Sequence, residues 1–292
     1  MKLREIRHAL WNIGFIENGI NEILNNKNPQ IKWVKKTIND RWFADPFILD
    51  VTDSEIILLV EEYCYNVKKG RIARLVIDRN TYYEKGYEII LECDTHLSFP
   101  FIFRQNNKVY VIPENSASGN STLYEYNDKY RTMTPIHLLA DEPFADATIF
   151  EFSGAHYLLT TKLPDTNSKS VLIYSFDKDK LKTLGRVSEV EFFAFCGRNA
   201  GEVFSSNYNL YRPAQDCTLR YGHGVIIQKI SFEDGQWIFK DVNSIYPNSF
   251  RYNQGIHTLN HYKGLYVIDG RGYRNPILGR ILNSFMLLIG KK

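Results

Sequence analysis

Short apolar runs separated by polar turns follow one another along the chain, and five of them open in a similar way. The clearest pair is Ala44-Asp45-Pro46-Phe47-Ile48-Leu49 and Ser98-Phe99-Pro100-Phe101-Ile102-Phe103. Related runs occupy residues 145–150, 199–204 and 254–259. The five recur about every 50 positions, a period typical of a propeller or another repeated array.

Each of these runs is followed by a second apolar run. The second runs end at Glu62, Glu114, Thr161, Gln215 and Gly270, and a third run follows in at least four repeats. The runs are rich in Val, Ile, Tyr and Phe and are separated by Gly, Asn and Asp, which is the composition of strands and tight turns. The sequence therefore predicts an all-β fold, a five-bladed β-propeller.

The ends of the chain complete this prediction. Residues 41–292 hold the blades and residues 1–40 precede them, so we expect one propeller domain over residues 1–292. Apolar runs near Trp11 and Trp33 predict strands, with a short helical stretch between them. Propellers avoid an exposed edge by lending an N-terminal strand to the last blade, and we expect a strand within residues 10–36 to close the ring. After Pro276 the pattern fits a helix packed on the propeller, with contact to a membrane surface as the less favoured alternative.

Composition excludes several classes of function. The net charge is only +3 and no basic run stands out, so we expect no nucleic-acid partner. The four cysteines form no Cys-x-x-Cys pair, which argues against zinc and against a disulfide framework. The charged N-terminus and the lack of a long apolar stretch predict a cytoplasmic protein without a transmembrane segment. We expect no cofactor, because the sequence has no glycine-rich phosphate loop.

Acidic residues occupy related positions in the first three repeats. Equivalent positions of a propeller lie on one ring around its axis, and antiparallel strands return to the same rim. We therefore expect Asp45, Glu62, Glu114 and Asp146 at a single opening, with Glu61 beside them. Such a set suits acid and base chemistry or the binding of a polyhydroxylated ligand. The structural alternative is that each Asp bonds its own backbone at a strand entry and each Glu is solvated.

The fourth and fifth repeats contribute other groups. Arg198 and Arg212 are expected to face the carboxylates, where they hold a phosphate or an acidic sugar unless they pair with acids. Tyr221 stands beside Gly222, which allows close backbone approach. His257 could act as acid, base or hydrogen-bond donor. His257 and His261 lie four apart on an expected hairpin, so no metal site is predicted.

The motifs as a series resemble a known family. Trp42-Phe43-Ala44-Asp45-Pro46-Phe47, Ile112-Pro113-Glu114, Asp146-Ala147-Thr148 and Arg212-Pro213-Ala214-Gln215-Asp216 are similar to the N-terminal propeller domain of glucosamine inositolphosphorylceramide transferases. That domain is itself similar to five-bladed glycosidases of the arabinanase and invertase type, including glycoside hydrolase family 43. The resemblance implies that Asp45 is a carboxylate base. The matching position of the second repeat is Phe99, which departs from the acidic pattern of the enzymes.

The leading hypothesis is a carbohydrate-active propeller that binds, and when catalytic cleaves or transfers, a glycosyl unit in surface-glycan metabolism. In that case Asp45 is the base or nucleophile, Glu114 the general acid, and Asp146 either tunes the pKa values or orients the substrate. The candidate ligand is a sugar, an oligosaccharide or a phosphosugar, and its candidate binding residues are Trp42, Glu62, Arg198, Arg212, Gln215, Tyr221 and His257. Two alternatives stay open: a non-catalytic glycan-binding module that serves a separate glycosyltransferase, and a protein-interaction propeller.

Overall fold

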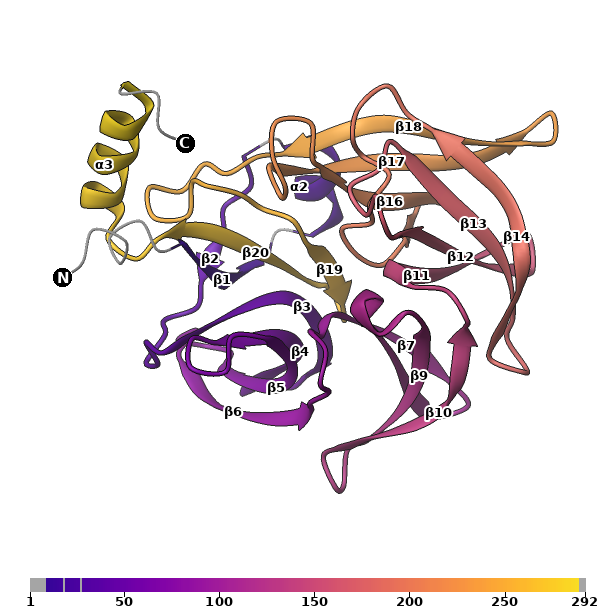
Figure 1. Ribbon diagram of the computed structural model, residues 1–292, viewed down its shortest axis with the longest axis horizontal. Helices are drawn as coiled ribbons and strands as arrows, with labels where there is room; N and C mark the ends of the chain where they lie inside the picture. Colours follow the sequence, from indigo (N-terminus) through magenta and orange to yellow (C-terminus); the bar gives the residue numbers. More distant parts are fainter. Residues whose placement is uncertain (1–8, 18, 27, 289–292) are drawn as a thin grey trace.

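Twenty strands form five four-stranded antiparallel sheets around a common axis in the computed structural model, which describes residues 9–17, 19–26 and 28–288 (Figure 1). Blade 1 consists of β3 (Arg41–Val51), β4 (Glu55–Cys64), β5 (Gly70–Asp78) and β6 (Glu84–Leu91). Blade 2 consists of β7 (Ser98–Gln105), β8 (Lys108–Glu114), β9 (Ser121–Asn127) and β10 (Thr132–Ala140). Blade 3 consists of β11 (Phe144–Phe152), β12 (Ala155–Lys162), β13 (Ser170–Asp177) and β14 (Lys182–Glu191). The predicted five-bladed β-propeller is confirmed.

The ring closes as the sequence predicts. Blade 4 consists of β15 (Phe204–Ser206), β16 (Asn209–Asp216), β17 (Gly224–Glu233) and β18 (Gln236–Ile245). Blade 5 combines the two ends of the chain in the order β19 (Leu259–Tyr262), β20 (Leu265–Tyr273), β1 (Ala9–Ile16) and β2 (Lys32–Trp33). Ile13 pairs with Asp269 in the middle of the β1–β20 ladder. Asn260 of blade 5 also links its two neighbours, because its side chain donates to Pro46 O at 2.9 Å and accepts from Glu202 N at 2.8 Å.

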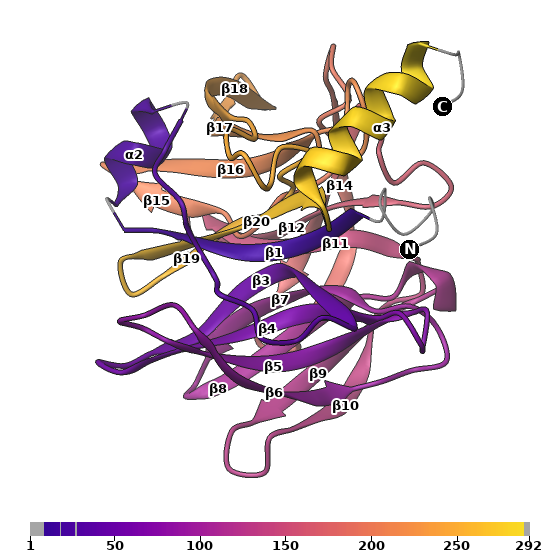
Figure 2. The ribbon, with the colours of Figure 1, turned by 90° about the vertical axis from the view of Figure 1, so that its left-hand side faces the viewer.

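Helices are few and lie outside the sheets. The short α2 (Ile20–Asn25) joins β1 to β2, and the 3₁₀ turn η1 (Ser116–Ser118) follows β8. The C-terminal α3 (Pro276–Leu288) begins directly after β20, as expected from Pro276, and extends away from the sheets (Figure 2). Among the residues placed by the structure, no helix combines the length and the apolar content needed to cross a bilayer.

The inner strands of blades 1, 2 and 3 share an irregularity that matters for the site. Each has a break in register within its first four residues, and each places one residue of the break at positive φ: Asp45 at 48°, Phe99 at 42° and Asp146 at 47°. A bulge of this kind bends the strand and redirects a side chain. Asp tolerates the left-handed region better than most residues, which suits two of the three positions. The first repeated motif is thus a repeated bulge.

Apolar side chains from neighbouring blades pack between the sheets. Phe47 of blade 1 meets Phe99 and Phe101 of blade 2 edge to face, with ring centroids 5.0 and 6.0 Å apart. Trp237 of blade 4 packs in the same way against Phe150 of blade 3 at 5.6 Å. These contacts account for much of the aromatic content and hold each bulge at a defined place around the axis.

Candidate functional site

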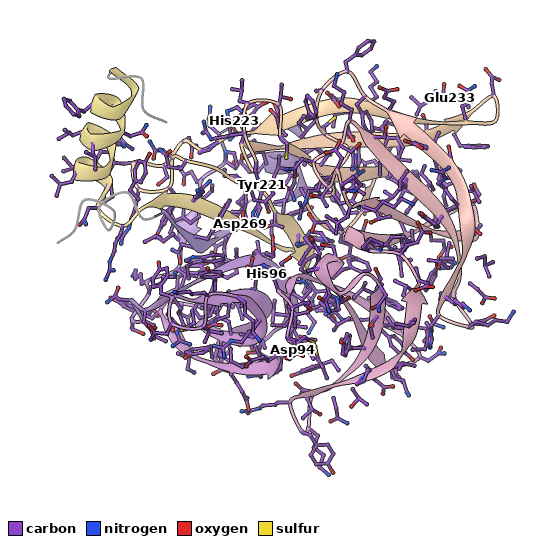
Figure 3. The ribbon with its side chains drawn as sticks, viewed as in Figure 1. Asp94, His96, Tyr221, His223, Glu233 and Asp269 are labelled. Carbon is purple, nitrogen blue, oxygen red and sulfur yellow. The ribbon has the colours of Figure 1, made fainter. Side chains whose placement is uncertain are left out.

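Polar side chains from all five blades gather where the inner strands bend. Tyr221, Asp269 and His96 lie around the middle of the ring in the view down the axis (Figure 3). We call this group the axial cluster. It consists of Asp45, Glu61, His96, Glu114, Asp146, Arg198, Gln215, Tyr221, His257 and Asp269.

Asp45 is held at the base of the axial cluster. Its carboxylate accepts a hydrogen bond from Phe99 N at 3.2 Å and faces His257 Nε2 at 3.4 Å. Only 4% of the residue is exposed. Burial raises the pKa of Asp45 to about 7, although the charge of His257 opposes the shift. Asp45 therefore changes charge near neutral pH, which suits a proton acceptor.

His257 is clamped between two carboxylates. Asp269 Oδ2 lies 2.5 Å from His257 Nδ1, and Asp269 Oδ1 accepts the backbone N–H groups of His257 and Thr258 at 2.9 and 3.1 Å. Trp11 stacks on the imidazole, with ring centroids 4.0 Å apart. Burial opposes the imidazolium, but Asp269 and Asp45 outweigh it and raise the pKa of His257 to about 9. The two carboxylates therefore favour the charged form of His257 at neutral pH.

The same three side chains are the residues best placed for a metal ion within the described part of the chain. One ligand atom each from Asp45, His257 and Asp269 lies within 4.8 Å of the others. A metal needs a neutral imidazole nitrogen, whereas both ring nitrogens here face carboxylates. The geometry fits an imidazolium better than a metal ligand.

A second buried group joins blades 2, 3 and 4. Arg198 places Nε 2.5 Å from Asp146 Oδ2 and Nη2 2.8 Å from Glu114 Oε2. Burial raises the pKa of Asp146 well above its usual range. The charge of Glu114 raises this pKa further, and Arg198 lowers it only in part. Burial also disfavours ionised Glu114, but Arg198 outweighs it and holds the pKa of Glu114 below its usual range. Of the two carboxyl groups, Asp146 is therefore the harder to ionise and Glu114 the easier.

Gln215 and Asn199 fix the orientation of this group. Gln215 Nε2 donates to Asp146 Oδ2 at 2.8 Å and to Asn199 O at 3.0 Å. Asn199 Nδ2 donates to Asp146 O at 2.7 Å, so blade 4 holds the bulge of blade 3 from two directions. Gln215 faces the axial cluster, where the sequence analysis places it.

Tyr221 covers the cluster on its solvent side. Its ring meets His257 edge to face at 5.3 Å, and the Arg198 guanidinium lies 5.3 Å from its centroid. The residue remains 39% exposed. Gly222 next to it has φ of 63°, and a Cβ there would lie 3.1 Å from His257 Cβ. Glycine thus lets the tyrosine loop approach the histidine closely.

Two further contacts extend the cluster toward blade 1. His96 Nε2 lies 3.0 Å from Glu61 Oε1, and 45% of the His96 side chain is exposed. Trp42 stacks on Tyr63, with centroids 4.9 Å apart and planes within 5°. Tyr63 lies 6.4 Å from the His96 ring, so this aromatic pair flanks the cluster.

The structure corrects the expected place of Glu62. Successive side chains of a strand point to opposite faces, and in β4 it is Glu61 that points to the axis. Glu62 is fully buried on the other face, where its carboxylate pairs with Arg41 at 2.8 Å and Arg71 at 3.0 Å. Glu62 is thus a buried acid paired with two arginines and does not lie with the axial carboxylates.

Arg212 is also corrected. It donates to Asn199 Oδ1 and Gln228 Oε1, both at 2.7 Å. Its guanidinium lies 5.7 Å from the ring centroid of Phe192 and 5.6 Å from that of Phe239. Burial lowers the pKa of Arg212 to about 10. Arg212 is fully buried, its guanidinium donates to neutral acceptors, and it does not face the axial carboxylates.

Sequence reasoning missed Asp269, Trp11 and His96. Asp269 precedes Gly270, where the second apolar run of the fifth repeat ends. The repeat could therefore have indicated that Asp269 lies near the axis. Trp11 comes from the closing strand, whose register with β20 no repeat specifies. His96 lies in the loop before β7, outside the repeated positions.

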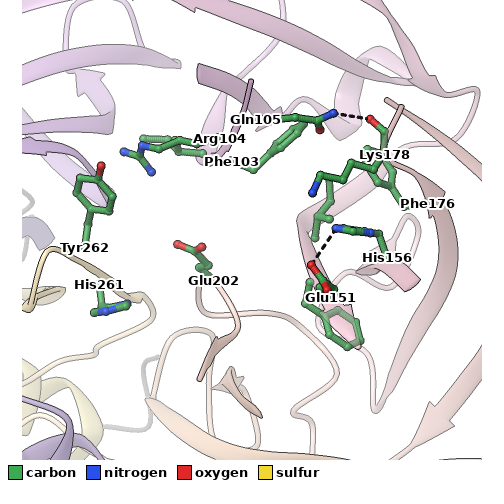
Figure 4. Close-up of a pocket in the computed structure, with 13 residues that line it drawn as sticks. Phe103, Arg104, Gln105, Glu151, His156, Phe176, Lys178, Glu202, His261 and Tyr262 are labelled. Atoms are coloured by element: carbon green, nitrogen blue, oxygen red, sulfur yellow. Dashed lines mark hydrogen bonds and ion pairs between the residues drawn. The ribbon is translucent and has the colours of Figure 1, made fainter. Parts of the chain in front are cut away.

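A cavity of about 380 Å³ opens among the hairpin turns, away from the axial cluster (Figure 4). Its lining includes Arg104, Glu151, His156, Glu202 and Tyr262. Burial raises the pKa of Glu202 to about 7, and Arg104 offsets this only in part. The folded state therefore disfavours ionised Glu202.

Glu202→Gln is expected to stabilise the protein at pH 8 and to change little at pH 4.5. The wild-type carboxylate costs stability as the pH rises from the unfolded pKa near 4.5 through the folded pKa near 7, by up to about 3 kcal/mol. Thermal unfolding at both pH values measures this. Glu151→Gln, at an exposed acid of the same cavity, is the control and should shift stability by less than about 0.5 kcal/mol. A gain for Glu202→Gln that is equal at both pH values would contradict the assignment.

Solved structures place this fold in a class. A glycoside hydrolase family 43 β-1,3-galactosidase matches 74% of this chain and 83% of its own length, with a TM-score of 0.55 and 12% identity. A family 43 β-xylosidase/α-arabinofuranosidase from a compost metagenome matches 82% and 93%, with a TM-score of 0.55 and 11% identity. The chain is a five-bladed propeller of this architectural class.

Residues 31–263 match the family described as glucosamine inositolphosphorylceramide transferase 1, N-terminal, and the chain belongs to that family. Proteins named glucosamine inositolphosphorylceramide transferase 1 from Oryza sativa subsp. japonica and Arabidopsis thaliana are 28% and 27% identical over 199 and 196 residues. The matches cover 64% and 65% of this chain, which spans about a quarter of each relative (26% and 25%). The resemblance inferred from the motifs is confirmed.

Proposed function

We propose that the axial cluster binds a glycosyl unit, with the ring of Tyr221 against the sugar and the carboxylates of Glu61 and Glu114 toward its hydroxyls. The observation that carries the proposal is the exposed Tyr221 ring above buried acids from three blades. An aromatic face stacks on the C–H face of a pyranose, while carboxylates accept hydrogen bonds from hydroxyls. Membership of a family named after a glycosyl-transferring protein supports the same ligand class.

The charge of the cluster favours an uncharged sugar over a phosphosugar. Arg198 is occupied by Asp146 and Glu114, and Arg212 lies elsewhere. A phosphate near Tyr221 would face Asp45 and Glu61 as well as the ionised Glu114. Repulsion from these acids opposes an anionic ligand.

Cleavage or transfer of the glycosyl unit is the second candidate function. It is favoured by the opposed pKa directions within the cluster, which separate a proton donor from acceptors. These directions reverse the roles inferred from the sequence: Asp146 is the protonated candidate acid, and Glu114 is the ionised group that tunes it. Asp45 keeps the role of base. This candidate activity does not require the part of the longer relatives that lies outside the match, because Asp45, Glu114 and Asp146 all belong to the propeller.

A glycan array followed by calorimetry tests binding. Wild type is expected to bind at least one glycan, and Tyr221→Ala to weaken binding by about tenfold, since an aromatic contact contributes about 0.5–1.5 kcal/mol beyond the area that it buries. Tyr130→Ala, at an exposed tyrosine on the β9–β10 turn, is the matched control and should bind as wild type does. Equal binding by all three proteins would overturn the site.

A screen of aryl glycosides separates catalysis from binding. Turnover by wild type that is lost in Asp45→Asn supports the catalytic candidate. Glycan binding without turnover of any substrate supports the non-catalytic module.

A further inference from the structure

A cavity of about 680 Å³ lies away from the axial cluster, at the junction of blades 5 and 1. Its walls come from the segment after β2, the start of β3, the loop before β19 and the connection from β20 to α3. Five of its lining residues are cationic: Lys35, Lys36, Arg41, Arg251 and Arg274. None of the described lining residues is Asp or Glu.

Four of these five cations form no ion pair with an acid in the part of the chain that the structure describes. Arg41 is neutralised by Asp40 and Glu62. Among the described residues, no carboxylate oxygen lies within 4.0 Å of Lys35, Lys36, Arg251 or Arg274. This differs from the axial cluster, where every described cation faces an acid. The cavity therefore presents unneutralised positive charge.

Lys36 is the most constrained of these cations. Its Nζ donates to Trp11 O at 2.9 Å. Burial lowers the pKa of Lys36 to about 7, with Glu84 opposing the shift and Arg251 adding to it. Glu84 is itself 7% exposed with a raised pKa, so it compensates the lysine weakly. An anion in the cavity would supply the missing counter-charge.

The remaining wall is aromatic. Trp33 packs against Tyr252 with ring centroids 4.4 Å apart. A Cβ on Gly270 would lie 2.2 Å from the Trp33 ring, so glycine at that position allows the indole to lie flat over β20. The cavity thus combines a flat apolar wall with cations on its other sides.

We propose that this cavity binds the phosphate of a phosphate-bearing ligand through Lys36, Arg251 and Arg274. Guanidinium groups suit phosphate oxygens because they offer paired N–H donors, and lysine adds a point charge. The sequence had suggested a phosphate beside Arg198 and Arg212. The structure shows those two occupied, whereas Lys36, Arg251 and Arg274 form no ion pair with any described acid. The site is separate from the axial cluster, so it stands whether or not the cluster binds a sugar.

The phosphate could belong to a soluble ester or to a lipid headgroup. Asn275 lines the cavity and α3 begins at the next residue. Ile277, Ile281 and Phe285 recur every fourth position on α3 and are 62%, 61% and 56% exposed. An apolar helix face beside a cationic cavity is typical of a segment that binds a membrane surface. The test therefore examines a soluble phosphate and a lipid headgroup separately.

Calorimetry with pyrophosphate at low ionic strength tests the soluble arm, and co-sedimentation with phosphatidylcholine vesicles, with and without phosphatidic acid, tests the lipid arm. We expect wild type to bind pyrophosphate or the acidic vesicles. The double variant Arg251→Gln, Arg274→Gln should weaken that binding by about tenfold or more. Lys129→Gln, Lys240→Gln removes the same charge from exposed positions on blades 2 and 4 and should change it less than about twofold.

The source follows from the pattern of results. Pyrophosphate binding without vesicle binding assigns a soluble ester. Binding to acidic vesicles that is lost in Ile281→Ser, Phe285→Ser as well as in the arginine variant assigns a headgroup. No binding of either probe, or equal weakening in the control and arginine variants, would overturn the proposal.

Discussion

Asp269→Asn is expected to lower the free energy of unfolding by about 3–5 kcal/mol, because it removes one partner of a buried ion pair. The carboxylate is fully buried and contacts the His257 ring and the backbone N–H groups of His257 and Thr258. Asparagine can keep some hydrogen bonds but leaves the imidazolium with one carboxylate. Denaturation by guanidinium chloride at pH 7 measures the loss.

The control is Asp50→Asn, which breaks the exposed pair with Lys263 and should cost less than about 1 kcal/mol. The effect of Asp269→Asn also depends on pH. The raised pKa of His257 means that stability from the charged ring is fully present below pH 6.5 and is lost as the pH rises through about 9. The difference between wild type and Asp269→Asn should therefore shrink above pH 9. A difference that stays constant from pH 7 to pH 10 would show that the ring is not charged.

Arg198→Met should have an effect of similar size, about 3–5 kcal/mol, because it leaves Glu114 ionised and buried beside Asp146. Adding Asp146→Asn should recover part of the loss, with a coupling energy of about 1–3 kcal/mol, since the second change removes an acid that the arginine had offset. Urea denaturation of both single variants and the double variant gives the coupling.

Arg186→Met is the matched control, because Arg186 forms an exposed pair with Glu189 and its loss should cost less than about 1 kcal/mol. Additive effects of Arg198→Met and Asp146→Asn would contradict a shared buried network.

The repeated motif was sufficient to predict the blades, the closing strand and much of the axial cluster. Asp45 and Asp146 could be placed because they occupy the same position of a repeated bulge, and rotation brings such positions to one axis. Arg198 could be placed because it precedes the equivalent segment of blade 4.

The predictions for Glu62 and Arg212 were wrong because a shift of one residue along a strand decides which face of the sheet a side chain lies on. Glu61 and Glu62 are neighbours, and strand alternation sends only Glu61 toward the axis. Arg212 and Gln215 are three positions apart in β16 and so point to opposite faces. Gln215 orients Asp146, whereas Arg212 is buried beside Phe192 and Phe239. The cationic cavity could not be predicted, because segments near residues 35, 251 and 274 meet only when the ring closes. The cytoplasmic location stays a prediction.

The most direct test of the proposed function is a crystal structure with the tightest-binding glycan from the array. We expect sugar density against the Tyr221 ring, with sugar hydroxyl groups within hydrogen-bonding distance of the Glu61 or Glu114 carboxylate. Density at another surface, with the Tyr221 face empty, would contradict it.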